Sequence, residues 1–172
     1  MVVRPALPAD AQELARLGER LWRETYTGLL PAGNLERHLA ATFGPSQQEA
    51  ELSHPECCTL ALEEGGVLLG YALLRAGHPQ ADSTAVGLAG ALEIARFYVD
   101  PSRHGTGAAQ TLMAAVLAHA ASTGRDGVWL QVWEQNLRGL RFYQKVGFTD
   151  AGAAAFRVGD QIERDRLLVK RL

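Results

Sequence analysis

The sequence predicts a single α/β domain, spanning residues 1–172, in which helices pack against a β-sheet. Three observations favour this class. Apolar alternation over residues 92–99 predicts a strand, and helical spacing of apolar residues follows it over residues 108–121. A second strand followed by a helix is predicted at residues 129–133 and 137–148. Two hairpin patterns stand on either side of these units. A chain of 172 residues is long enough to bury a sizeable core.

The first helix is predicted by a start signal and by an apolar face. Asp10, three residues before Glu13, forms a capping-box pattern, in which side chains pair with backbone N–H groups of the first turn. Apolar residues then recur with helical spacing at Leu14, Leu17, Leu21 and Trp22. A short strand is expected before this helix, near residues 2–4.

Two further helices are predicted before the first hairpin. Residues 25–33 contain glycine and proline and are expected to form a loop, after which Asn34 would cap a helix. Leu35, Leu39 and Phe43 would form the apolar side of this helix. Ser46, followed three residues later by Glu49, marks the start of a third, short helix.

The hairpins are predicted by apolar runs separated by turn residues. Residues 59–62 and 67–74 flank a Gly-Gly turn, which favours the first hairpin. Residues 76–90 are rich in Gly, Ala and small polar residues and are expected to form a mobile connection. Residues 156–158 and 167–169 are expected to pair in a closing hairpin.

The strand at residues 92–99 should present two faces, because side chains alternate along a strand. The expected faces are Leu92, Ile94, Arg96 and Tyr98 on one side, and Glu93, Ala95, Phe97 and Val99 on the other. Pro101 cannot continue a β-ladder, so the strand should end near Asp100. Gly124 lies just beyond the next helix, where a stop is expected.

The turn between this strand and helix predicts a ligand that carries phosphate. A helix start has unpaired N–H groups and the positive end of the helix dipole, and small residues let an anion approach them. The loop is His104, Gly105, Thr106, Gly107, Ala108 and Ala109. The Walker A pattern fails because no Gly-Lys-Ser/Thr follows the glycines. The dinucleotide pattern is weak because Gln110 stands where its third glycine belongs.

A second motif follows the loop and its helix along the chain. The strand at residues 129–133 is followed by Asn136 and by a helix that ends Phe142-Tyr143-Gln144-Lys145-Val146-Gly147-Phe148. Together the two segments resemble the GNAT superfamily of acyl-CoA-dependent N-acyltransferases. In that family the loop has the form Gln/Arg-x-x-Gly-x-Gly/Ala, and the later helix ends Phe-Tyr-x-x-x-Gly-Phe. The resemblance is specific from about residue 93 to residue 148.

The resemblance implies a GNAT fold and an acetyl-CoA substrate. The implied fold has a mixed, mostly antiparallel central sheet with helices on both faces, in which two neighbouring parallel strands separate and form a cleft for the pantetheine arm. The implied acyl-CoA contacts are Phe97, Tyr98, Val99, Arg103, His104, Gly105, Thr106, Gly107, Ala108, Ala109, Asn136 and Tyr143. The backbone N–H of Val99 would contact the oxyanion. Arg141 and Lys145 would either meet the 3′-phosphate of coenzyme A or be solvated helix charges.

Transfer of an acyl group from a thioester to an amine needs a base for the amine and an acid for the departing sulfur. The resemblance places Glu93 at the position of the base, acting directly or through water. A solvated glutamate, or one in a salt bridge with Arg96 or another cation, is the alternative. Tyr143 is the candidate acid, since a neutral phenol can donate to a thiolate; the alternative is a core tyrosine. Asn136 either binds pantetheine amides or caps the last helix.

Two positions depart from the family pattern. His104 replaces the usual Gln or Arg, and its imidazole could make cofactor affinity sensitive to pH. Gly139 replaces a commoner Ala, which should loosen its helix slightly. Of the two tryptophans on the second strand, Trp129 is expected in the core, while Trp133 is a candidate to line an acceptor pocket.

Composition narrows the class of protein. Hydrophobic residues make up 47% and charged residues 21% of the chain, as in soluble globular domains. A net charge of −2 argues against binding of nucleic acid. The sequence shows neither a membrane-spanning run nor a signal peptide, and adjacent Cys57 and Cys58 offer no disulfide framework, so a cytoplasmic protein is expected. The five histidines show no metal-ligand spacing, so no metal is expected.

The activity predicted is transfer of an acetyl group, or a close acyl group, from acyl-CoA to a primary amine by direct attack in a ternary complex. The alternative is a catalytically silent acyl-CoA-binding sensor or partner domain of the same fold. The acceptor stays open between small-molecule amines and protein amines, and the segments at residues 25–33, 76–90 and the final hairpin are expected to select it. Homodimers are common among similar proteins, although the sequence contains no stripe that demands one.

Overall fold

The computed structural model describes residues 1–28, 30–77, 87–88, 90–158 and 161–172. Its strands form one seven-stranded sheet in the order β1-β2-β3-β4-β5-β7-β6. The strands are β1 (Val2–Pro5), β2 (Cys57–Glu64), β3 (Val67–Arg75), β4 (Leu92–Val99), β5 (Gly127–Trp133), β6 (Thr149–Val158) and β7 (Gln161–Arg171). The α-helices are α1 (Ala11–Tyr26), α2 (Ala32–Phe43), α3 (Pro45–Ser53), α4 (Ala108–Ser122) and α5 (Leu137–Lys145). The predicted α/β class is confirmed.

The sheet is antiparallel at every strand pair except β4 with β5. These two parallel strands are paired only at Leu92 with Val128 and at Glu93 with Trp129. Six residues of β4 and four of β5 continue beyond this point without a β4–β5 pairing. The two strands therefore separate after their first contacts, as the resemblance implied.

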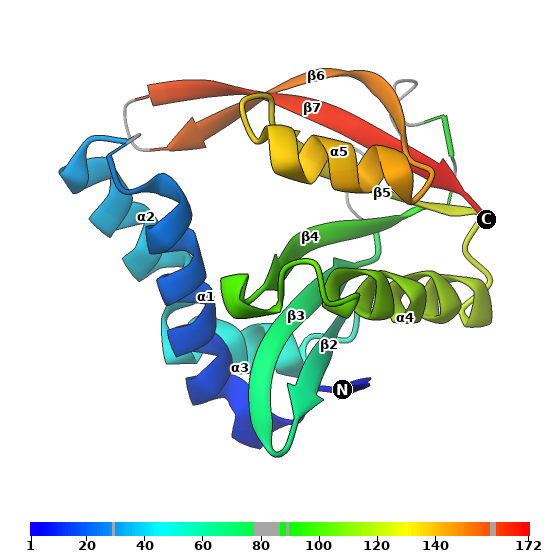
Figure 1. The fold of residues 1–172 in the computed structure, drawn as a ribbon, viewed down its shortest axis with the longest axis horizontal. Coiled ribbons are helices and arrows are strands. Elements are labelled where there is room, and N and C mark those ends of the chain that lie inside the picture. The colour runs from blue at the N-terminus through cyan, green and yellow to red at the C-terminus, as the bar shows by residue number, and fades with distance from the viewer. Residues whose placement is uncertain (29, 78–86, 89, 159–160) are drawn as a thin grey trace.

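Helices cover both faces of the sheet (Figure 1). Helix α4 and residues of α5 pack on one face, where Leu112, Met113 and Val116 join a core cluster with side chains of β2 to β5. Helices α1, α2 and α3 pack on the other face. Figure 1 shows α5 and the β6–β7 hairpin above β4, and α1 with α2 at the left.

A β-bulge in β4 changes the expected faces of this strand. Leu73 of β3 lies opposite Arg96, whereas the next residue, Leu74, lies opposite Ile94. Ala95 is therefore the extra residue of a bulge, and such a residue shifts the alternation of side chains by one position. The strand bounds were predicted correctly, but the bulge was not.

The predicted faces of β4 are consequently wrong. Ile94 and Phe97 both pack against the cluster beneath α4. Arg96 and Tyr98 lie on the opposite face, where Arg96 bonds to α3 and Tyr98 packs against α1 and α2 side chains. Glu93, which lies opposite Arg75, shares this face with Arg96 instead of sharing one with Phe97. The bulge thus directs Glu93 and Phe97 to different sides of the sheet.

Two predicted helix caps are also corrected. The Asp10 side chain makes no cap bond to α1, because its carboxylate accepts from Arg4 and from the Leu7 backbone N–H. Asn34 does not precede α2 but lies within it, and its side chain accepts from Arg37. In both cases a nearby arginine donates a hydrogen bond to the side-chain oxygen that was expected to cap the helix.

One predicted loop is shorter than expected, and another lies mostly outside the described residues. Helix α1 extends to Tyr26 and α2 begins at Ala32, so helical residues occupy both ends of the predicted loop at residues 25–33. Helix α3 begins at Pro45, where proline is favoured because its missing N–H needs no partner there. Most of the predicted connection at residues 76–90 lies outside the described residues.

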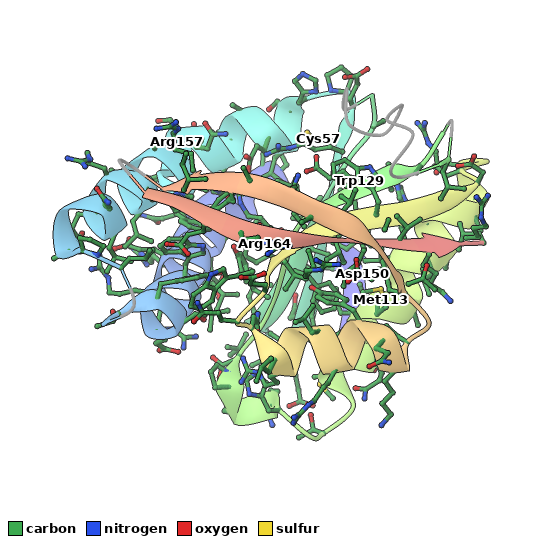
Figure 2. All side chains as sticks on the ribbon, turned by 90° about the horizontal axis from the view of Figure 1, so that it is seen from above. Cys57, Met113, Trp129, Asp150, Arg157 and Arg164 are labelled. Atoms are coloured by element: carbon green, nitrogen blue, oxygen red, sulfur yellow. The ribbon has the colours of Figure 1, made fainter. Side chains whose placement is uncertain are left out.

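The closing hairpin is confirmed, with a different register. Strands β6 and β7 are longer than the predicted segments, and Phe156 lies opposite Glu163 while Leu167 lies opposite Gly152. The two apolar segments used for the prediction are therefore not partners of one another. Figure 2 shows this hairpin crossing the molecule, with Arg157 at its α2 end and Asp150 toward α5.

A buried ion pair joins β4 to α3. Both guanidinium nitrogens of Arg96 donate to the Glu51 carboxylate, at 2.5 and 2.9 Å, and one of them also reaches the Thr42 carbonyl at 3.1 Å. The two side chains are only 6% and 7% exposed. Removing one partner of such a pair leaves an uncompensated charge in the interior.

We expect Glu51→Ala to lower the free energy of unfolding by about 3–5 kcal/mol, because Arg96 would keep its charge without its carboxylate. Urea denaturation of the purified protein measures this change. Glu49→Ala, on the exposed side of the same helix, is the control and should change stability by less than about 0.5 kcal/mol. Similar small losses in both variants would show that the ion pair contributes little.

Candidate functional site

The loop before α4 has the conformation that its glycines predict. Gly105 and Gly107 adopt φ angles of 78° and 88°, in the left-handed region that favours glycine. A side chain at either position would meet nothing within 4 Å, so the backbone angle itself is the reason for glycine. Gly107 is the N-cap residue, and the first helical bond runs from Thr111 N–H to its carbonyl.

The loop uses two of its own amides. His104 N–H donates to the Pro101 carbonyl at 3.1 Å, and Thr106 N–H donates to the Arg103 carbonyl at 3.3 Å. The first N–H groups of a helix have no partner within the helix, so the first turn of α4 supplies the donors that remain. An anion at this loop would therefore be bound chiefly by the start of α4.

His104 connects the loop to β4 and to α5. Arg138 donates from its guanidinium to Nδ1 of His104 at 2.9 Å, and Nε2 lies 3.3 Å from the Val99 carbonyl. Arginine has no acceptor, so Nδ1 must accept and Nε2 must carry the hydrogen that the carbonyl receives. The neutral imidazole satisfies both bonds. His104 thereby fixes the loop against the end of β4.

A cavity of about 540 Å³ extends from this loop to the gap between β4 and α5. Nine of the twelve predicted acyl-CoA contacts line it: Phe97, Tyr98, Val99, Arg103, His104, Gly105, Ala109, Asn136 and Tyr143. Three of the residues predicted to bind the ligand, Thr106, Gly107 and Ala108, are not part of its lining, and Ala108 is buried in the core. Arg138 lines the cavity, whereas Arg141 and Lys145 do not.

The end of β4 turns backbone groups toward this cavity. Asp100 N–H donates to the Leu69 carbonyl at 2.7 Å, while Val99 lies opposite Gly70. This pattern makes Val99 and Gly70 a non-hydrogen-bonded pair of the antiparallel ladder, in which the N–H of Val99 points away from β3. It therefore points toward the side from which β5 has separated. This is the direction that the predicted oxyanion contact requires.

A second cavity, of about 460 Å³, continues the first on the side of α1 and the β6–β7 hairpin. Five residues line both cavities: Tyr26, Phe97, Tyr98, Asn136 and Tyr143. The second cavity also contains Glu93 and Trp133. Trp129 is fully buried in a separate core cluster, as predicted. The two cavities meet at the five shared residues, Tyr143 among them, and together they are called the channel below.

Tyr143 lies at the junction of the channel. Its ring is packed among Phe97, Phe142 and Phe148, with centroids 5.3 to 6.1 Å apart. Burial raises the pKa of the Tyr143 phenol above its ordinary value. A phenol with a raised pKa stays protonated at physiological pH and can donate a hydrogen. The residue has both a core contact and access to the channel, so the two interpretations of the sequence are compatible.

Asn136 also combines both interpretations. Its side-chain oxygen accepts from the Gly139 backbone N–H at 2.9 Å and so caps α5. The residue lines both cavities, with its side-chain amide nitrogen still a donor. A side chain at Gly139 would come within 2.8 Å of this amide nitrogen. Gly139 therefore leaves room for the Asn136 cap.

Glu93 lies in the second cavity beside a cation. Its carboxylate is 4.0 Å from the Arg75 guanidinium, and its side chain is 13% exposed. The nearby cation is Arg75 and not Arg96, because the carboxylate that binds Arg96 belongs to Glu51. The residue is partly buried in the channel and also participates in a salt bridge.

Asp165 and Tyr26 lie in two of the segments expected to select the acceptor, although no sequence pattern singled out either residue. Asp165 lies on β7 opposite Trp133 and lines the second cavity, with the residue only 6% exposed. Burial raises the pKa of its carboxyl to about 6, and the charges of Glu163 and Glu134 add to the shift. Tyr26, whose phenol pKa is also raised by burial, packs 5.7 Å from the Trp133 ring. Neither residue belongs to a local motif.

Among the described residues, no cluster of His, Cys, Asp or Glu could hold a metal ion. Both cysteines are free. Within the part of the chain that the structure describes, no helix is long and apolar enough to cross a membrane.

Residues 17–148 match the family described as Acetyltransferase (GNAT) family. The chain belongs to the GNAT family of acetyltransferases. It is 34% identical, over 95% of its length, to an uncharacterized N-acetyltransferase of Mycobacterium tuberculosis, of which it covers 98%. A mycothiol acetyltransferase of Thermobispora bispora is 32% identical over 83% of this chain and 59% of that protein. The GNAT prediction is thus confirmed, and the chain is an acyl-CoA-dependent acetyltransferase.

The fold likewise matches solved structures. The PaiA N-acetyltransferase of Thermoplasma acidophilum, solved in complex with coenzyme A, aligns with a TM-score of 0.78 over 99% of this chain and 98% of that one. The sequence identity is 19%, so this similarity concerns the fold. It confirms the predicted GNAT architecture.

Proposed function

We propose that this acetyltransferase transfers an acetyl group directly from acetyl-CoA to a primary amine while both are bound. The observation that carries the proposal is the channel: two cavities meet at Tyr143, where β4 and β5 have separated. Coenzyme A would occupy the cavity at the α4 loop, and the amine would occupy the cavity that contains Glu93. Two cavities that meet at one residue suit two substrates that react there.

The residues of the first cavity fit an acyl-CoA. The first turn of α4 offers N–H donors and a positive dipole end to the diphosphate. Arg138 and Arg103 add guanidinium groups, although Arg103 also pairs with Glu64 at 2.8 Å. The amide of Asn136 suits the peptide-like groups of pantetheine, and Phe97 with Phe142 provides an apolar wall.

Three groups would carry the reaction. The neutral amine forms a C–N bond with the thioester carbon, and the Val99 N–H donates to the oxyanion that develops. Glu93, which lies six residues before Val99 on β4, accepts through water the proton that the amine loses. The C–S bond then breaks, and the departing thiolate takes the phenolic proton of Tyr143. The raised pKa of Tyr143 keeps this proton in place until the sulfur leaves.

Four further properties belong to the proposal. The chain acts as one domain, since a single sheet contains strands from residue 2 to residue 171. Catalysis uses no metal, because the groups named above suffice for it. The protein acts in the cytoplasm, in keeping with its free cysteines, and it does not bind nucleic acid. A homodimer stays a prediction.

The activity is tested with purified protein, acetyl-CoA and a panel of primary amines, by following release of the free thiol. We expect release with at least one amine, together with formation of its N-acetyl product. Binding of coenzyme A by calorimetry, without turnover of any amine, would instead support a silent acyl-CoA sensor. Absence of coenzyme A binding would overturn the proposed function as a whole.

We expect Tyr143→Phe to lower kcat by about 10²–10⁴-fold, because the thiolate would leave without its acid. The substitution keeps the ring and its contacts with Phe97 and Phe148, so affinity for coenzyme A should change little. Steady-state kinetics and calorimetry measure the two effects separately. Equal losses in both would mean that Tyr143 has only a packing role.

For Glu93→Gln we expect a rate loss that becomes smaller as the pH rises. At high pH more of the amine is already neutral, since a Lys-like amine has a pKa of about 10.4, and the base matters less. The pH profile of kcat/KM for the variant, compared with the unmodified protein, measures this. A loss of the same size at every pH, or none, would remove Glu93 from the role of base.

A further inference from the structure

The acceptor cavity contains more negative charge than its own cations balance. Two guanidiniums line it, those of Arg75 and Arg96. Both contact Glu51, and Arg75 also lies beside Glu93, so two cations face two carboxylates. Glu163 and Asp165 line the same cavity on β7, and no salt bridge to either is found within the described residues. Their charges are left for a ligand.

Asp165 is the buried member of this pair. The residue is 6% exposed, and its Oδ1 atom has no hydrogen-bond partner among the described residues. A buried carboxylate without a partner is unfavourable, so such groups are normally paired. Its position in the cavity lining means that the missing partner can come from a bound molecule. A cation with N–H donors would satisfy the atom.

Aromatic rings surround the two carboxylates. Trp133 lies opposite Asp165 in the β5–β7 register, and its indole N–H donates to Glu163 at 3.2 Å. Tyr26 packs against Trp133, and it lines the same cavity as Asp165. Aromatic faces attract ammonium groups, and carboxylates at their edge add to this attraction.

Asp165 lies far along the channel from Glu93. Glu93 is level with Trp129, and Asp165 is level with Trp133, four residues further along β5. At 3.3 Å per residue these levels are separated by about 13 Å. One small ammonium group cannot contact both carboxylates. Two separated positive charges on one molecule can.

We propose that Asp165 and Glu163 bind a second ammonium group of the acceptor, which makes the acceptors linear aliphatic amines with two or more positive charges. This inference rests on the proposed function, because Glu93 and Tyr143 would receive the amine that reacts. Free amino acids would be disfavoured, since their carboxylate would meet Asp165 and Glu163. Aromatic amines, which are neutral at pH 7, would lack the charge that the site requires.

The pH dependence follows from the surroundings of Asp165. The facing titratable groups are Glu163 on β7, Glu134 beyond β5, Tyr26 on α1 and His38 on α2, and Glu93, Arg75 and Arg96 lie across the cavity. Burial lowers the pKa of His38, so this group stays neutral, and the two arginines are engaged by carboxylates. The pKa of Asp165 is raised to about 6. Below that pH the carboxyl becomes neutral, and its attraction for a cation is lost.

The test compares kcat/KM for linear diaminoalkanes of increasing length with that for monoaminoalkanes of the same length. We expect the unmodified protein to prefer the diamine of matching length by about ten- to hundredfold, as one charge-assisted contact allows. Asp165→Asn should remove most of this preference, and Glu163→Gln part of it. Asp150→Asn is the control. It removes a carboxylate of the same hairpin that pairs with Arg166 outside the cavity, and it should keep the preference.

Equal kcat/KM for diamines and monoamines in the unmodified protein would overturn the inference, as would an unchanged preference in Asp165→Asn. Folding of each variant is checked by calorimetry with coenzyme A. Should Asp165→Asn fail to fold, two other measurements test the inference. The preference for diamines should be smaller in Glu163→Gln, and in the unmodified protein it should decline as the pH falls below 6. A preference that is unchanged in both measurements would contradict the assignment.

Failure of this inference can be separated from failure of the proposed function. Titration of the coenzyme A-loaded protein with a diaminoalkane measures binding without turnover. Diamine binding that Asp165→Asn weakens, in a protein that releases no thiol, would support this site and contradict the activity. Equal rates of thiol release with monoamines and diamines would support the activity and contradict this site.

Discussion

The structure depends on a single interruption of its sheet: β4 and β5 are paired at two positions and then part. A buried parallel strand ordinarily has neighbours on both sides, which satisfy its N–H and carbonyl groups. Beyond the last residue paired with β5, the backbone N–H and carbonyl groups on this edge of β4 face a cavity lined by side chains. The Val99 N–H points there. The channel, the proposed oxyanion contact and the location of Tyr143 all follow from the same separation.

The bulge at Ala95 determines which side chains of β4 face each part of the channel. Without it, Glu93 and Phe97 would lie on one face of β4. With it, Phe97 packs against Phe142 in the first cavity, while Glu93 and Arg96 turn toward α3. The Arg96–Glu51 pair holds that face against the helices. One inserted residue thus separates the apolar part of the channel from its ionic part.

The sequence was sufficient where a local motif defines the structure. The turn before α4, the capped start of α5 and the bounds of β4 were all predicted, because glycine angles, an asparagine cap and a proline act over a few residues. The faces of β4 and the partners in the closing hairpin were not. A bulge or a register depends on the opposing strand, and that strand is distant in sequence. For the same reason no pattern singled out Asp165, since only the pairing of β7 with β5 brings it into the channel.

The charges along the channel would separate the two proposed ligands before any bond is made. At one end, Arg138, Arg103 and the start of α4 favour an anion; Glu24, the carboxylate in that lining, is paired with Arg20. At the other end, Asp165 and Glu163 exceed the cations around them. The net charge of −2 for the whole chain does not reveal this difference in charge between the two ends of the channel. Because like charges repel more strongly where water is excluded, an anionic cofactor would be kept from the acceptor end, and the proposed cationic amine from the phosphate loop. The proposed substrates would then meet at the neutral aromatic residues in the middle.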